Sequence, residues 1–138
     1  MDNALSPEQH ESLVMQISNE KSPHKRLEIA ARISRQLYDA EKTQLDFLRG
    51  ALILDPEFKQ LEIERERRRY KRQEESIKMM AKEKVFNERI PLSKIRDILW
   101  AFTGRDIYRM LVLERGWSSD EYEKWLGGLL IQALLTSR

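Results

Sequence analysis

Apolar residues recur every three or four positions along most of the chain, which is the spacing of an amphipathic helix. No stretch alternates apolar and polar residues as a half-buried strand would. The pattern therefore predicts an all-α protein, folded as a single-domain bundle of about six helices.

Three cap-and-proline pairs divide the first half of the chain. Ser6, Ser22 and Asp55 each precede a proline. Proline suits the first position of a helix because its missing N–H has no partner there in any case. These signals predict a short helix after Ser6, a long helix from Ser22 to about Leu52, and a highly charged helix over about 56–84.

Three further starts organise the second half. Helices are expected from about Ser93, from Thr103 as an N-cap, and from about Ser119. The last helix contains Gly127 and Gly128, and each interior glycine costs about 1 kcal/mol against alanine. Close approach of another helix is the usual reason for such a pair.

The stretch "RGWSSDEY" has residues that a catalytic site could use, since it holds two serines and two acids beside a tryptophan. Helix ends account for the same residues. Gly116 fits the left-handed residue after one helix, and Ser118 with Glu121 forms a capping box for the next. Trp117 and Tyr122 occupy the places of a hydrophobic staple. We therefore interpret the stretch as a corner between helices.

Composition narrows the classes of protein. The 138 residues carry 25 basic and 23 acidic side chains, a net charge of +2 that does not indicate a nucleic-acid protein. There is no cysteine, which excludes disulfides and thiolate chemistry. The first residues lack the charged and apolar regions of a secretory signal, and no apolar run approaches the roughly 20 residues of a membrane span. A soluble, cytoplasmic protein is expected.

Residues that carry chemistry are scarce. His10 and His24 lie 14 residues apart without a carboxylate at metal-ligand spacing. The serines cluster at helix starts, and there is no nucleophile elbow, phosphate loop or dinucleotide motif. We expect no enzyme activity, no cofactor and no metal.

The basic run from Arg65 to Arg72 is the strongest electrostatic signal. Its side chains spread around a helix among several glutamates, so a solvated, ion-paired helix is the favoured interpretation, and a nucleic-acid patch is the less favoured one. A third interpretation places Arg65, Arg68 and Arg72, on one stripe with Leu61 and Met79, beside a cavity for an acidic ligand.

The last helices carry more apolar surface than one small domain easily covers. A helix that is apolar on more than one face must be buried on more than one face, which suggests a partner subunit. The residues predicted for this dimer seam are Ile95, Ile98, Leu99, Phe102, Leu126, Leu129, Leu130, Ala133 and Leu134.

The segment "IRDILWAFTGRDIYRMLVLERGWSSDEYEKWL" resembles the C-terminal regulatory domain of TetR/AcrR-type transcriptional regulators. Upstream, "PHKRLEIAARI" and "LDPEF" are similar to the helix after that family's DNA-binding headpiece and to the start of its long central helix. The resemblance covers about 22–135. It divides the chain into an extension with one short helix, 1–21, and a regulatory domain, 22–138.

The resemblance implies a domain that dimerises through its last helices and holds a small apolar or amphipathic effector among its central helices. Aromatic and methionine side chains fill a core more often than they line a pocket, but the resemblance raises the weight of a pocket. The residues predicted to line it are Tyr38, Phe47, Phe58, Tyr70, Met80, Trp100 and Tyr108.

The family's headpiece has no counterpart in this sequence, so the chain alone is not expected to bind DNA. The predicted function is effector sensing and homodimerisation in a TetR-type regulator without its helix-turn-helix. The alternative is a helical dimerisation module without a ligand, acting as a dominant-negative partner of a full-length relative.

Overall fold

The computed structural model describes residues 15–17 and 19–135, apart from the side chains of Leu45 and Asp46. The fold is all-α, as the sequence predicts, and the described residues contain no strand beyond one isolated bridge between Phe86 and Leu135. The helix expected after Ser6 falls mostly outside the described residues.

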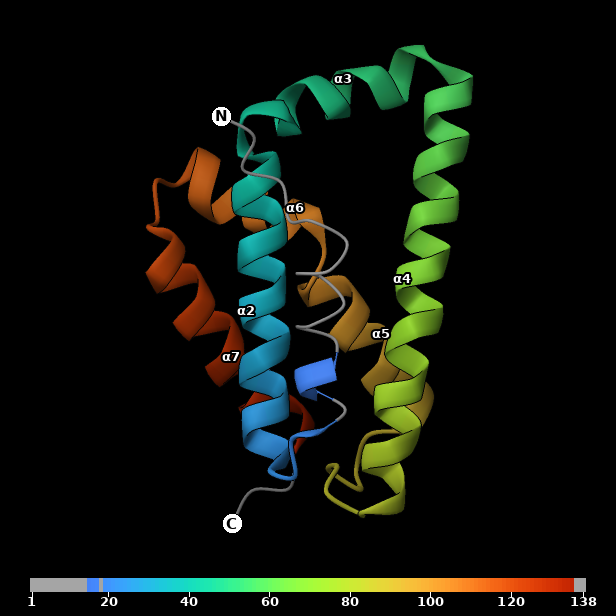
Figure 1. Cartoon of the computed structure of the whole chain (residues 1–138), viewed down its shortest axis with the longest axis vertical. Helices are drawn as coiled ribbons and strands as arrows, with labels where there is room; N and C mark the ends of the chain where they lie inside the picture. Colours follow the sequence, from blue (N-terminus) through green and yellow to red (C-terminus); the bar gives the residue numbers. More distant parts are fainter. Residues whose placement is uncertain (1–14, 18, 136–138) are drawn as a thin grey trace.

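Two long helices frame the molecule (Figure 1). Helix α2, Pro23–Glu41, and helix α4, Pro56–Lys82, run along its long axis, and α3, Leu45–Leu54, crosses between them at one end. The prediction of one continuous helix from Ser22 to Leu52 is therefore wrong. The helix breaks at a 3-10 turn, Lys42–Gln44, which contains no buried side chain to hold a continuous helix in place.

Helices in the second half pack on this frame. Helix α5, Leu92–Phe102, lies beside α4, and the short helix α6, Arg105–Tyr108, leads into a π-helical segment, Arg109–Glu114. The last helix, α7, Ser119–Leu134, packs along α2.

Local capping signals account for most of the boundaries. The Ser22 hydroxyl accepts from the Lys25 N–H, and the Asp55 carboxylate accepts from the N–H groups of Glu57 and Phe58. Helix α4 ends two residues earlier than expected, because Lys84 has a left-handed φ of 57° that cannot continue a helix.

The corner before α7 has the predicted capping chemistry. Gly116 is left-handed at φ 76°, and Ser118 and Glu121 form a reciprocal capping box. The Trp117 ring meets Trp125 edge-on, with ring centroids 5.6 Å apart.

Two expectations for the segment from Thr103 onward are wrong. Thr103 is the C-cap of α5 and is 3% exposed, and Gly104 caps α6 instead. The helix also widens into π-helical winding after Tyr108. This winding brings residues five apart onto adjacent turns, and Arg109 accordingly pairs with Glu114 at 2.6 Å.

The core lies between α2, α4, α5, α6 and α7. Its centre is a stack of three tyrosines: the ring centroid of Tyr108 lies 5.7 Å from that of Tyr38 and 5.1 Å from that of Tyr122. Asp39 accepts hydrogen bonds from the Tyr108 hydroxyl at 2.5 Å and from the Ser119 hydroxyl at 2.6 Å. This network fixes the start of α7 against the end of α2.

Candidate ligand cavity

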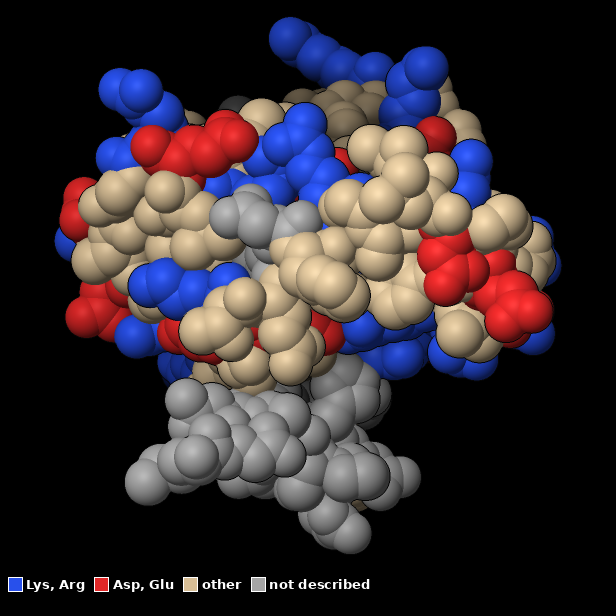
Figure 2. All heavy atoms as spheres, turned by 90° about the horizontal axis from the view of Figure 1, so that it is seen from above, with Lys and Arg blue, Asp and Glu red and all other residues tan. Residues whose placement is uncertain are grey.

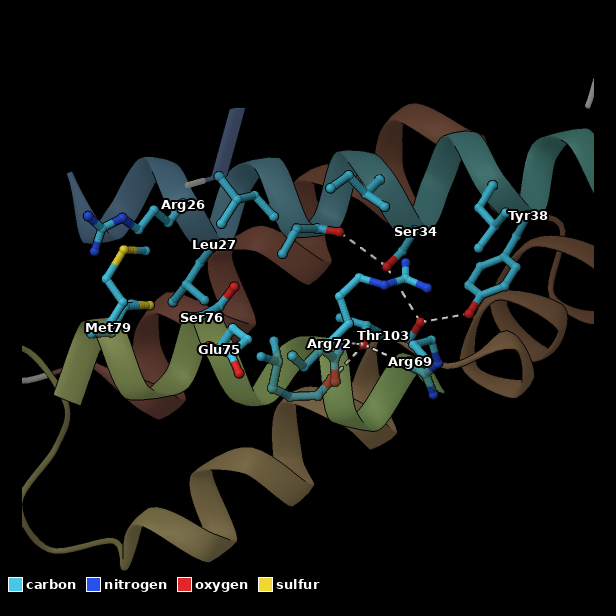
Figure 3. Close-up of a pocket in the computed structure, with 17 residues that line it drawn as sticks. Arg26, Leu27, Ser34, Tyr38, Arg69, Arg72, Glu75, Ser76, Met79 and Thr103 are labelled. Atoms are coloured by element: carbon cyan, nitrogen blue, oxygen red, sulfur yellow. Dashed lines mark hydrogen bonds between the residues drawn. The ribbon is translucent and has the colours of Figure 1, made fainter. Parts of the chain in front are cut away.

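A cavity of about 520 Å³ lies between α2 and α4 and reaches α5 (Figure 3). Its volume falls within the range of roughly 300–1,000 Å³ that is typical of small-molecule sites. It forms because α3 bridges the two long helices at one end, which leaves α2 and α4 facing each other along their length.

Apolar side chains make up the middle of the cavity. The α2 wall is aliphatic, whereas the α4 wall carries two neighbouring methionines, Met79 and Met80. Methionine adapts to irregular shapes, so this part of the α4 wall can pack against apolar groups of variable outline. The apolar lining residues are Ile17, Leu27, Ala30, Ile33, Leu37, Met79, Met80 and Leu99.

Polar groups gather at one end of the cavity, around Thr103. The Thr103 hydroxyl accepts from Arg69 Nη1 and from Gln73 Nε2, both at 2.9 Å, and donates to the Leu99 carbonyl at 2.6 Å. The Thr103 carbonyl accepts from the Tyr38 hydroxyl at 2.9 Å. One buried threonine thus connects α2, α4 and α5 at the polar end.

Burial shifts the pKa of the tyrosine in this cluster. Withdrawal from water disfavours the charged form, and it raises the pKa of the Tyr38 hydroxyl to about 12. Tyr38 therefore stays protonated at neutral pH and acts as a hydrogen-bond donor to Thr103.

Arg72 brings positive charge into the cavity. Figure 3 shows its side chain reaching from α4 toward α2. Withdrawal from water lowers the pKa of the Arg72 guanidinium, and the positive charges of Arg69, Arg68 and Arg65 lower it further. The Glu75 carboxylate lines the same cavity, so the α4 wall carries charged side chains of both signs.

The other end of the cavity is closed by a paired charge. Arg26 is 5% exposed, and its Nη1 donates to both carboxylate oxygens of Glu83 at 2.9 Å. Its Nε donates to the Glu20 carbonyl at 2.5 Å. Because these contacts engage its charge, Arg26 closes the wall and joins α2 to the end of α4.

Two of the seven predicted cavity residues, Tyr38 and Met80, line this cavity. Tyr108 does not line it and is fully buried in the tyrosine stack. Phe47, which is 72% exposed on α3, and Phe58, which is half-buried at the start of α4, also lie outside its lining. Phe47 lies on α3, which crosses at one end of the molecule, and Phe58 lies in the first turn of α4, next to that end.

The remaining two, Tyr70 and Trp100, line a second and more open groove of about 920 Å³ between α4 and α5. Their rings meet edge-on with centroids 6.0 Å apart, and the Arg96 guanidinium lies 3.7 Å from the centroid of the Tyr70 ring. The Tyr70 hydroxyl donates to Asp97 at 2.8 Å. Neighbouring side chains of the chain itself therefore contact these aromatic rings.

The arginine stripe divides between two environments. Arg72 and Met79 line the cavity, as one interpretation of the sequence expected. Arg65 instead pairs with Glu41 and Glu62, and Leu61 is 63% exposed. The Glu41–Arg65 contact ties the end of α2 to α4, outside the cavity.

Sequence reasoning missed the polar and charged lining residues Arg26, Ser34, Arg69, Gln73, Glu75, Ser76 and Thr103. Serine, glutamine and threonine are most often surface residues, so their type alone did not mark them. On α4, however, every lining residue except Glu75 lies on one stripe with intervals of three and four, from Arg69 to Met80. That stripe, opposite an apolar stripe on α2, was the available signal.

The predicted dimer seam divides between the core and the surface. Five of its members are buried within the chain's own core: Ile95, Leu99, Leu126, Leu130 and Leu134. The sequence pattern does not reveal that α2 covers the inner face of α7. The other four, Ile98, Phe102, Leu129 and Ala133, are half-buried and remain the candidates for a seam.

Gly127 serves this internal packing. It is buried, and a Cβ built on it would lie 3.7 Å from the Glu28 Cα of α2. Gly128 faces open space, with no heavy atom within 4 Å of such a Cβ. The close helix approach expected of the glycine pair is therefore found within the chain, at Gly127.

Within 15–17 and 19–135, no three His, Asp or Glu side chains are grouped to hold a metal ion. None of the helices in that part of the chain is long and apolar enough to cross a membrane. Comparison with protein-family models, curated proteins and solved structures finds no match to this chain.

Proposed function

We propose that this protein is a small-molecule sensor that also self-associates, comparable to the regulatory domain of TetR-type transcriptional regulators. The observation that carries the proposal is the cavity of about 520 Å³ between α2 and α4. Well-packed cores contain few voids larger than a water molecule, so a cavity of this size in a small helical domain favours a ligand.

The position of the cavity supports a sensing role. Its polar end is built on Thr103, which lies at the junction of α5 and α6 and bonds to α2 and α4. A ligand at this end competes for the same donors and acceptors. Its binding therefore changes how α5 and α6 are held against the two long helices.

An apolar dye tests the cavity. An anilinonaphthalene sulfonate dye is expected to bind with one site per chain, and Ala30→Phe is expected to abolish that binding, because Ala30 lines the cavity. Ala40→Phe is the matched control on the same helix, since Ala40 is half-buried and outside the cavity lining. Equal dye binding by the two variants would contradict the proposal.

Sedimentation equilibrium tests the self-association. A dimer at micromolar concentration is expected, weakened by Leu129→Glu on the half-buried side of α7. A wild-type protein that stays monomeric would remove this half of the proposal.

A ligand-free interaction module is the second candidate, and a specific surface favours it. Large apolar side chains are exposed along α3 and the first turns of α4, and Figure 2 shows uncharged surface over this end of the molecule. The residues concerned are Phe47, Ile53, Leu54 and Leu61, each more than 60% exposed. Absence of dye binding together with a stable dimer would favour this module over the sensor.

A further inference from the structure

Helix α3 is apolar on two opposite faces. Only Asp46 and Arg49 are charged among its ten residues, Leu45–Leu54. Leu48 packs against the core of the chain and Leu52 lines the second groove, so these two leucines mark the inner face. A helix that is apolar on more than one face must be buried on more than one face, and the chain itself covers only the side of Leu48 and Leu52.

The outer face of α3 consists of Phe47, Gly50, Ile53 and Leu54. At helical spacing these four residues fall within one arc of about 120°, opposite the inner face. Phe47, Ile53 and Leu54 are 72%, 80% and 82% exposed. Because α3 crosses from α2 to α4 at one end of the molecule, its outer face points away from the other helices (Figure 1).

Gly50 lies at the centre of this outer face. A glycine inside a helix costs about 1 kcal/mol against alanine. At Gly127 the close approach of α2 offsets that cost, but a Cβ built on Gly50 would meet nothing within 4 Å outside its own helix backbone. The open position at Gly50 therefore leaves room for a second helix to cross closely.

The outer face is complementary to itself in the antiparallel direction. A two-fold axis at Gly50 places each residue opposite the residue of a second copy that lies equally far on the other side of Gly50. Phe47, three positions before Gly50, then lies opposite Ile53 of the second copy, three positions after it. The symmetry makes this contact twice, so both exposed apolar pairs are covered together.

The charges at the two ends of α3 agree with this direction. Lys42 precedes α3 and Glu57 follows it, both are exposed, and neither has an ion pair among the described residues. Nearby, Asp55 caps α4 and Lys59 lines the second groove. An antiparallel second copy brings Lys42 of one chain near Glu57 of the other, whereas a parallel copy brings like charges together.

We propose that the outer face of α3 is a second self-association surface, on which two copies of this chain pack their α3 helices antiparallel about a two-fold axis at Gly50. The surface is separate from the cavity and from the α7 face, and it does not depend on the proposed sensing function. Four residues per copy make a small contact, which is typical of weak association. Dimers formed through α7 therefore join through α3 only as the concentration rises.

Sedimentation equilibrium of the Leu129→Glu chain tests α3 without the α7 face. A reversible dimer is expected, with a Kd on the order of 100 µM. Gly50→Gln in that background fills the space at the crossing and is expected to weaken the dimer about tenfold or more, while the fold is kept because glutamine is a better helix former than glycine. Gly128→Gln is the matched control, since it makes the same change at an open helical glycine of α7, and the α3 dimer should persist.

Reversed charges test the antiparallel direction in the same background. Lys42→Glu and Glu57→Lys are each expected to weaken the dimer about fivefold at low ionic strength, because each change sets like charges against each other at two places. The chain that carries both changes should recover the original affinity. An apolar partner other than a second copy gives no such recovery.

The outcomes separate this surface from the proposed function. A Leu129→Glu chain that stays monomeric up to about 1 mM overturns the α3 contact and leaves the cavity and the α7 dimer as they were. A dimer that survives Gly50→Gln, that is weakened equally by Gly128→Gln, or that does not recover in the double reversal also overturns it. A wild-type chain that is monomeric at micromolar concentration but associates near 100 µM removes the α7 dimer instead.

Discussion

Replacing Thr103 by valine removes one hydroxyl from the junction of α2, α4 and α5 while keeping the side-chain shape. Three hydrogen bonds pass through that oxygen, to Arg69, Gln73 and the Leu99 carbonyl. The residue is 3% exposed, so water cannot easily replace them. Its main-chain carbonyl still accepts from Tyr38 in the variant.

The magnitude follows from the groups left without partners. The Leu99 carbonyl keeps the Thr103 N–H at 3.1 Å, so its loss is small. The Gln73 amide loses about 1 kcal/mol, and the charged Arg69 donor loses about 2 kcal/mol. The free energy of unfolding should fall by about 3 kcal/mol, which lowers Tm by roughly 10 °C for a domain of this size.

Thr103→Ser supplies the matched control. Serine keeps the hydroxyl and loses one methyl group, which costs about 1 kcal/mol. Urea unfolding followed by far-UV circular dichroism measures both variants. A valine variant as stable as the serine variant, or more so, would refute the role of the hydroxyl as the link between α4 and α5.

Three further changes test other parts of the structure. Gly128→Ala should raise the free energy of unfolding by up to about 1 kcal/mol in chemical denaturation, because the position is helical and open. Lys84→Gly should stabilise by up to about 1 kcal/mol in the same assay, since glycine relieves the left-handed strain at φ 57°. Burial raises the pKa values of Tyr38, Tyr108 and Tyr122, that of Tyr38 to about 12, so the folded state keeps protons that the unfolded state loses above about pH 10. The contribution of these tyrosines to stability should be constant below that pH and fall above it, with a shallower fall in Tyr38→Phe, as measured by urea unfolding at stepped alkaline pH.

Helix ends were predictable because their chemistry is local. Ser22, Asp55 and Ser118 each satisfy N–H groups within three residues of themselves, so the sequence alone contains both partners. Gly116 was predictable for a similar reason, because glycine is the residue that most readily adopts the left-handed conformation after a helix, and its φ is 76°. No distant part of the chain is needed for these assignments.

Thr103 shows why other features were not predictable. Its sequence context, before Gly104 and three residues ahead of Asp106, is a reasonable N-cap signal. The hydroxyl is taken instead by Arg69 and Gln73, which lie 34 and 30 positions earlier on another helix. Long-range partners of this kind override a local preference. The polar end of the cavity was not predicted for the same reason, because its hydrogen bonds join residues from three different helices.

Long-range packing also explains why the last helix carries so many apolar residues. Helix α7 buries Leu126, Leu130 and Leu134 against the rest of the chain, with Gly127 allowing α2 to lie close. Residues four apart share a face, so this stripe is the inner side of the helix. Any self-association through α7 must therefore use a different face, around Gly128 and Leu129. Gly128→Ala then separates two situations, because it stabilises an exposed helix but weakens a dimer whose helices cross closely at that position.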